Sequence, residues 1–250
     1  MRYFIEFSYN GKAYHGWQRQ PKASSIQQTI EDAMSLLLRE KIQLVGAGRT
    51  DAGVHARQLY AHFDFESKVE KTEVVQRLNA FLPEDIAIKD IIEVSPKAHA
   101  RFDALERTYE YRVVQEKDPF NTDWAHYVHL PLHMEAMNLA AAELMKHTDF
   151  ECFSKSNTDV KTYVCRLKEA KWRREGNTLI FTITADRFLR NMVRAIVGTL
   201  LDVGLQKSSV ENVNSIIKSK DRGEAGVSVP AKGLYLMKIT YPKTLFKLHG

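Results

Sequence analysis

The sequence predicts an α+β protein made of two halves, each with the element order β-α-β-β-α-β. Stretches of alternating apolar and polar residues, typical of half-buried strands, follow one another with stretches that are apolar every three to four positions, typical of helices. The same order occurs twice along the chain. It is the split βαβ order of ferredoxin-like and RNA-recognition-motif-like units. Two such units would form one extended antiparallel sheet with helices on one face and an open face for a partner.

The first half begins with an alternating strand over residues 2–9, which ends at Asn10-Gly11. Ser25 and Gln28 form a capping-box pattern, so a helix should begin near this serine. The remaining predicted elements are strands at 42–45 and 58–65, a helix over 72–82 and a strand over 86–94.

The second half repeats this order. Its predicted elements are a strand at 108–114, a helix at 134–145, hairpin strands at 162–172 and 178–185, helices at 188–203 and 210–217, and a strand at 234–241. The boundary should fall near residues 96–106, which gives an N-terminal half of residues 1–100 and a C-terminal half of residues 101–250. Because no long Gly/Ser linker separates the halves, we expect them to pack as one body.

Composition restricts the possible classes of protein. The chain has 250 residues and a formal net charge of +5, which permits a polyanionic partner without requiring one. Two cysteines are too few for a disulfide framework. The N-terminus carries a charge at Arg2, so it lacks the apolar core of a signal peptide. No apolar run approaches the ~20 residues of a membrane span. We therefore expect a cytoplasmic protein that does not enter a membrane.

A glycine-rich loop, residues 46–56, lies between two predicted strands and contains one acidic side chain, Asp51. Three glycines allow positive φ and close approach to another molecule. A lone carboxylate beside Arg49 is a candidate for chemistry. The alternative is an aspartate that caps a turn through its own backbone, and the loop by itself favours that alternative.

Three arginines in the second half are a second candidate for a functional site. A helix over 187–201 would place Arg187, Arg190 and Arg194 in one stripe opposite its apolar face. Such a stripe can bind carboxylates or phosphates in a bidentate manner. The alternative is a solvated basic face with weak ion pairs.

Aromatic and basic residues also gather at the predicted strand 108–114. Tyr109 and Tyr111 lie close to Arg101, Arg107 and Arg112, and this combination on a sheet binds unpaired bases and their phosphates. The alternative is a half-buried strand, which we favour for Tyr111. The hairpin is basic as well and either follows a phosphate backbone or protects a sheet edge; its cations are Lys161, Arg166, Lys168, Lys171, Arg173 and Arg174.

No cofactor or metal is expected. The spacing of His126, His129 and His133 suggests a metal site, but Pro131 interrupts any helix and no cysteine or carboxylate completes the ligand set. The glycines of the 46–56 loop lack the third glycine and the following helix of a dinucleotide site.

The segment Gly48-Arg-Thr-Asp-Ala-Gly-Val-His-Ala56 resembles the catalytic signature of the tRNA pseudouridine synthase A family. The resemblance covers nearly the whole chain, in the family's order. It includes Tyr14-His-Gly-Trp-Gln-Arg-Gln20, Leu82-Pro-Glu-Asp-Ile86, His99-Ala-Arg-Phe-Asp-Ala104, Arg107-Thr-Tyr109, residues 188–198 and Gly233-Leu-Tyr-Leu236. One departure is Ala98, where the family usually carries Phe; it affects local packing and not the chemistry.

The resemblance implies the pseudouridine synthase fold with a central catalytic cleft. The activity it implies is an isomerase that converts uridines at tRNA positions 38 to 40, in the anticodon arm, without a cofactor. It also implies a homodimer that binds tRNA in a shared basic cleft.

The resemblance assigns roles to individual residues. Asp51 is the nucleophile, Arg194 its cationic partner, and Tyr109 stacks on the base. Arg49 fills the space left by the flipped nucleotide or holds its phosphates. Further substrate-binding roles go to His55, Arg101, Arg107 and Arg190. Whether Asp51 attacks C1′, adds to C6 or removes the 2′ proton stays open.

Three other functions compete with this one. A non-catalytic RNA-binding protein would leave the acidic loop unexplained. A nucleoside hydrolase would use the same aspartate with water as acceptor and release free uracil. A structural interaction protein gives no reason for the loop.

Overall fold

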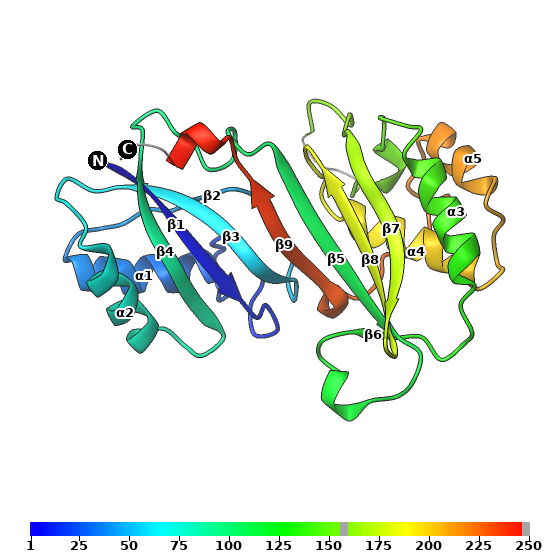
Figure 1. The fold of residues 1–250 in the computed structure, drawn as a ribbon, viewed down its shortest axis with the longest axis horizontal. Helices are drawn as coiled ribbons and strands as arrows, with labels where there is room; N and C mark the ends of the chain where they lie inside the picture. Colours follow the sequence, from blue (N-terminus) through cyan, green and yellow to red (C-terminus); the bar gives the residue numbers. More distant parts are fainter. Residues whose placement is uncertain (156–159, 247–250) are drawn as a thin grey trace. The chain divides into compact units, whose positions relative to one another are not determined.

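The structure is a computed structural model that describes residues 1–155 and 160–246. These residues form nine strands and five α-helices, which confirms the α+β class (Figure 1). Two compact units are present. Residues 1–105 and 236–246 belong to the first unit, and the described part of residues 106–235 forms the second.

The first unit is built on β1, which pairs antiparallel with a strand on each side in the order β4-β1-β3. Phe4 and Ile5, which point to opposite faces of this central strand, are both fully buried. Helices α1 and α2 pack against each other (Figure 1). The bounds are β1 Arg2–Tyr9, α1 Ile26–Leu38, β2 Val45–Gly46, β3 His55–Asp64, α2 Lys71–Phe81 and β4 Ile86–Val94.

The face of β1 that carries Phe4 is not open. The rings of Tyr241 and Phe246 pack edge-on against Phe4, with centroids 5.4 and 6.1 Å away, and the ring of Tyr60 adjoins them. The expectation of a free sheet face is therefore wrong for this part of the first unit, because the last described segment of the chain covers it.

The second unit has the antiparallel strand order β5-β8-β7. The predicted hairpin is present and its second strand has the predicted bounds, but its first strand covers residues 167–175 and not 162–172. The short strand β6, which pairs parallel with β5, was not predicted. Helix α3 packs on β7 and α4. The bounds are β5 Glu106–Val114, β6 His126–Tyr127, α3 Met134–Leu144, β7 Leu167–Glu175, β8 Thr178–Ala185, α4 Met192–Gly204 and α5 Asn212–Ser219. The last strand, β9 Leu234–Thr240, begins in the second unit and belongs to the first unit from residue 236.

Four short 3₁₀ helices complete the described elements: Pro119–Asn121, Glu151–Phe153, Ala231–Gly233 and Lys243–Phe246. The longest α-helices, α1 and α4, have 13 residues each. Within residues 1–155 and 160–246, no helix is long and apolar enough to cross a membrane.

The start of α1 is as predicted. Ser25 has extended backbone angles, and its Oγ accepts a hydrogen bond from the Gln28 amide at 3.3 Å. The apolar pattern of the predicted helices at 72–82 and 134–145 places Phe81 and Met145 on their buried sides, but both side chains are exposed. Phe81 is the last residue of α2, and Met145 directly follows α3.

The predicted arginine stripe is wrong. Helix α4 begins at Met192, so Arg187 and Arg190 precede it and only Arg194 is helical. Asn191 has a left-handed backbone conformation, with φ of 67°, which interrupts any continuous helix. Asparagine tolerates this conformation better than most residues. Its side chain donates to Ser228 Oγ at 2.6 Å, which fixes the break.

The buried imidazole of His62 gives the first unit a pH-dependent stability. Burial and the neighbouring Arg2 lower the pKa of His62 to about 4. Its Nδ1 accepts a hydrogen bond from the Ala100 amide at 3.1 Å. Since the unfolded histidine titrates near 6.5, the unfolded chain gains the proton first as the pH falls. The contribution of the neutral His62 to the free energy of unfolding is therefore fully present above about pH 6.5 and is lost as the pH falls toward 4.

We expect His62→Asn, which keeps an acceptor but cannot titrate, to weaken this dependence. Between pH 7 and 4.5 the wild type should lose about 2 kcal/mol more unfolding free energy than the variant. Urea unfolding at both pH values measures the difference. Asp64, whose pKa is lowered by its hydrogen bond to Arg2, titrates below this window. Equal losses in the two proteins would contradict the assignment to His62.

Candidate functional site

The loop that carries Asp51 connects β2 to β3 in the first unit. It is anchored at its start, where the Ala47 amide donates to the Tyr60 carbonyl at 2.8 Å. Within it, the Val54 amide donates to the Asp51 carbonyl at 3.2 Å. The Asp51 side chain is half-buried, whereas Arg49 is exposed. The Asp51 backbone therefore takes part in the turn.

A second segment, residues 14–17, holds this loop on both sides of Asp51. The Trp17 amide donates to the Thr50 carbonyl, and the Gly53 amide donates to the Tyr14 carbonyl, each at 3.3 Å. Gly16 has φ of 90°, and a Cβ there would lie 2.3 Å from the Thr50 carbonyl oxygen. Only glycine permits this approach.

Side chains from β1 and β3 complete the support. The hydroxyls of Tyr9 and Thr50 are hydrogen-bonded at 2.7 Å. His55 is buried, and its Nδ1 accepts a hydrogen bond from the Gly11 amide at 3.1 Å. This contact gives His55 a structural role in holding the loop; its predicted contact with substrate stays a prediction. Asp51 is thus presented by a backbone fixed at its neighbours.

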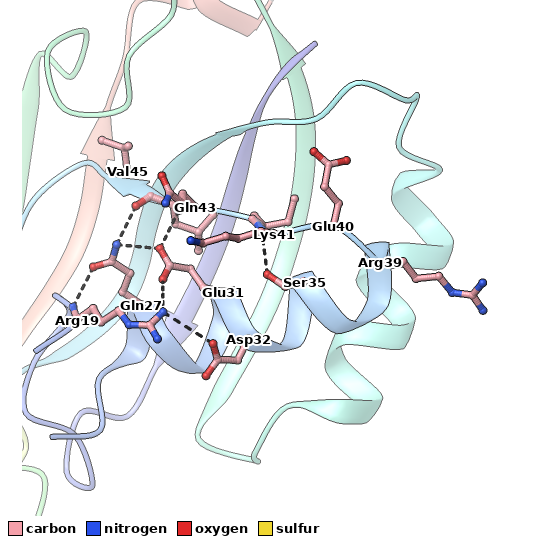
Figure 2. Close-up of a pocket in the computed structure, with 12 residues that line it drawn as sticks. Arg19, Gln27, Glu31, Asp32, Ser35, Arg39, Glu40, Lys41, Gln43 and Val45 are labelled. Atoms are coloured by element: carbon pink, nitrogen blue, oxygen red, sulfur yellow. Dashed lines mark hydrogen bonds and ion pairs between the residues drawn. The ribbon is translucent and has the colours of Figure 1, made fainter. Parts of the chain in front are cut away.

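A surface hollow on α1 supports the same loop from the side of β2 (Figure 2). At its centre the buried carboxylate of Glu31 accepts from the Leu44 amide and the Gln27 side chain, both at 2.9 Å, and pairs with Arg19 at 3.3 Å. Gln27 also donates to the Leu44 carbonyl at 2.9 Å. These groups bond to one another and connect α1 to the strand before the Asp51 loop, so the hollow is structural.

In the second unit, Tyr109 and Tyr111 differ. Tyr111 is fully buried and donates to the Pro230 carbonyl at 2.8 Å, which confirms the structural interpretation favoured for it. Tyr109 is half-buried, and its ring packs edge-on against Phe188 at 5.2 Å. Arg107, two residues before Tyr109 on β5, donates to the Asp186 carbonyl at 2.8 Å.

Arg194 lies in the first turn of α4, and its guanidinium has a fixed direction. Its Nε donates to the Val229 carbonyl at 2.7 Å, and the Val229 amide donates back to the Arg194 carbonyl at 3.2 Å. The segment around Val229 thus orients this side chain. Arg187 instead donates to the Thr162 carbonyl at 3.1 Å, and Arg190 is exposed.

The basic hairpin is partly neutralised. Arg173 pairs with Glu110 and Glu175, both at 2.8 Å, and Lys168 pairs with Glu106. These contacts favour the edge-protecting interpretation for those cations. Lys161, Lys171 and Arg174 are exposed and are the hairpin cations best suited to phosphate contacts.

No group of three or more potential metal ligands occurs among the described residues. The two cysteines, Cys152 and Cys165, are buried and free. Burial raises the pKa of Cys152 to about 12 and that of Cys165 to about 11, so both are thiols at neutral pH. They act as small apolar residues.

The predicted site residues are divided between the two units. Asp51, Arg49, His55 and Arg101 belong to the first, and the remaining four, Arg107, Tyr109, Arg190 and Arg194, belong to the second. That they act in one cleft stays a prediction. Sequence reasoning missed the support of Asp51 by Tyr9 and the orientation of Arg194 by Val229. Only the Tyr14–Gln20 motif signalled part of this support.

Comparisons with known proteins agree on one family. A family model described as tRNA pseudouridine synthase matches residues 6–103 and 140–242. The chain is 50% identical over 246 residues to a tRNA pseudouridine synthase A of Parabacteroides distasonis, covering 98% of each chain. It is 50% identical over 249 residues to a protein of the same name from Porphyromonas gingivalis, covering 98% of this chain and 99% of the relative. A further relative of that name, from Caldicellulosiruptor bescii, is 38% identical over 239 residues, covering 95% and 98%. This chain belongs to the tRNA pseudouridine synthase family.

Proposed function

We propose that this protein converts uridine to pseudouridine in tRNA, at positions 38 to 40 of the anticodon arm, with Asp51 as the catalytic group. Family membership supports the reaction and the substrate. The observation that carries the assignment of Asp51 is its setting. It is the only carboxylate of a glycine-rich loop whose backbone is bonded to residues 14–17 on both sides.

The reaction breaks the bond between N1 and C1′, turns the uracil and joins C5 to C1′. The C5 proton is lost and N1 gains one, so substrate and product are isomers and no redox step is needed. A carboxylate can act as nucleophile toward C1′ or C6, or as base toward the 2′ proton. Each route needs a carboxylate at a fixed position against a base turned out of the helix.

The other residues have supporting roles in this proposal. Arg194 stabilises the Asp51 carboxylate, and Tyr109 stacks on the target uracil. Arg49 occupies the space left by the flipped nucleotide or holds its phosphates. His55, Arg101, Arg107 and Arg190 are proposed to bind the RNA, by contact with phosphates in the case of the arginines.

Product analysis with tRNA labelled as [5-³H]uridine tests the proposal. The wild-type protein should release tritium, and nuclease digestion should then yield pseudouridine at positions 38 to 40. Free uracil as product would show a hydrolase instead. Binding without tritium release would show a non-catalytic RNA-binding protein.

Arg194→Ala should lower kcat about 100-fold, because loss of one preorganised charged partner typically costs this much. Affinity for tRNA should change little, since other cations bind the phosphates. Single-turnover tritium release and filter binding measure the two quantities. Arg190→Ala is the matched control, an exposed arginine four residues earlier, and should affect binding more than kcat. A normal rate for Arg194→Ala would show that another cation partners Asp51.

The family resemblance further supports a homodimer in the cytoplasm, with tRNA bound by both subunits. Sedimentation velocity with and without tRNA tests the dimer and its stoichiometry.

A further inference from the structure

We propose that Phe102 is a stacking platform for an unpaired base of the RNA, held in place by the rings of His99 and His62. The inference rests on the proposed function in one respect, namely that the ligand is RNA. It adds a base-binding residue to that proposal, outside the Asp51 loop.

Phe102 is 75% exposed in the turn-rich segment 95–105 that follows β4. Single exposed apolar side chains are common on proteins, so exposure alone does not indicate a site. What distinguishes Phe102 is the way its ring and backbone are supported.

Four rings are arranged in sequence from the core to the surface. Phe4 on the central strand lies 6.2 Å from His62, His62 lies 4.6 Å from His99, and His99 lies 4.2 Å from Phe102, measured between ring centroids. The His99 ring packs against the Phe102 ring at a tilt of 35°, and Phe102 is nevertheless 75% exposed. The ring is thus supported from the core side while most of its surface remains accessible to a base.

The same imidazoles fix the backbone beneath the ring. His99 Nδ1 accepts hydrogen bonds from the amides of Arg101 at 3.1 Å and Phe102 at 3.3 Å. The His99 amide donates to Asp103 Oδ2 at 2.8 Å. Burial and Arg2 lower the pKa of His99, so its imidazole stays neutral and accepts these bonds at pH 7. A platform fixed before binding loses little entropy when a base stacks on it.

The surrounding charges favour RNA over a protein partner. The Arg101 guanidinium lies 5.9 Å from the Phe102 ring and is exposed, as is Lys97 on the same segment. The nearby carboxylates are already bonded, Asp64 to Arg2 at 2.7 Å and Asp103 to the His99 amide. An aromatic ring beside cations is the combination that binds a base and its phosphate.

Fluorescence anisotropy of a fluorescein-labelled, unmodified tRNA transcript tests the proposal. Phe102→Ala should raise Kd about 10-fold, the typical loss for one stacked base. Phe102→Trp, which keeps an aromatic face, should bind within about 2-fold of wild type. Phe81→Ala is the matched control: the same substitution at a 62% exposed position on α2 of the same unit, expected to have no effect.

Salt dependence separates stacking from charge. Arg101→Ala should reduce the slope of log Kd against log salt by about 1, because one phosphate contact is lost. Phe102→Ala should leave the slope unchanged. In steady-state assays of tRNA modification, Phe102→Ala should raise KM and leave kcat unaltered. This is the result expected for a residue that binds the substrate and the transition state equally well.

Binding by Phe102→Ala within 2-fold of wild type would overturn the inference. So would weakened self-association in sedimentation velocity with unchanged RNA affinity, since that result assigns Phe102 to contact with a second copy of the chain. Circular dichroism confirms folding of each variant. Product analysis of the wild type tests the proposed reaction independently, so failure of one proposal is distinguishable from failure of the other.

Discussion

Asp51→Asn should lower the rate of tritium release from [5-³H]uridine tRNA by at least about 1,000-fold, on the scale found when a catalytic carboxylate or nucleophile is removed. The amide has the size of the carboxylate but cannot act as nucleophile or base. Tight binding of tRNA should persist, within about 3-fold, because phosphate contacts elsewhere supply most of the affinity.

The loop should keep its conformation in this variant. The backbone hydrogen bonds of Thr50, Asp51 and Gly53 and the bond between the Tyr9 and Thr50 hydroxyls support the loop, and these contacts do not involve the Asp51 carboxylate. A single-turnover assay under saturating enzyme therefore measures chemistry alone.

Asp32→Asn is the matched control for Asp51→Asn. Asp32 is an exposed aspartate on α1 in the same unit, and its replacement should leave the rate unchanged. If Asp51→Asn kept a rate within 10-fold of wild type, the catalytic group would have to be sought elsewhere. If it lost tRNA binding as well, Asp51 would be a binding residue and its assignment to chemistry would fail.

Much of the fold was predictable because its signals are local. The alternation over residues 2–9 and 86–94 gave both strands with the bounds observed for β1 and β4. Ser25 marked the start of α1 through a cap that reaches only three residues ahead. The turn residues Glu175-Gly176-Asn177 between two strand patterns predict the β7–β8 hairpin, and Gly176 has the positive φ, 55°, that such a turn requires.

The features that the sequence did not predict correctly depend on contacts between residues that are distant along the chain. Apolar residues continue the helical pattern through Phe188 and Leu189, yet Asn191 breaks it through a bond to Ser228, 37 residues away. Tyr9 reaches Thr50 across 41 residues and Arg194 reaches Val229 across 35. The family motif located Asp51, but periodicity and spacing could not show which residues hold it.

Gly198→Ala should destabilise the second unit by about 3 kcal/mol, at the upper end of the usual cost of overpacking. A Cβ at this position in α4 would lie 1.9 Å from the Val227 carbonyl oxygen. On the facing segment, a Cβ at Gly226 would likewise lie 2.5 Å from the Thr199 amide nitrogen of α4. Neither group is a flexible side chain that can turn away. The helix and the segment before β9 must therefore separate.

That separation should also disturb Arg194, because the displaced segment contains its acceptor Val229. We expect a melting temperature lower by about 6–12 °C and a reduced kcat even where the protein is fully folded. Gly223→Ala is the matched control, since its Cβ would meet only the Asp221 side chain, at 3.2 Å. Calorimetry and single-turnover tritium release separate the two effects. If Gly198→Ala melted normally, the close packing would be wrong. If it melted early but reacted normally when folded, Val229 would not be what orients Arg194, and the carbonyl bond at 2.7 Å would be a structural contact without a catalytic consequence.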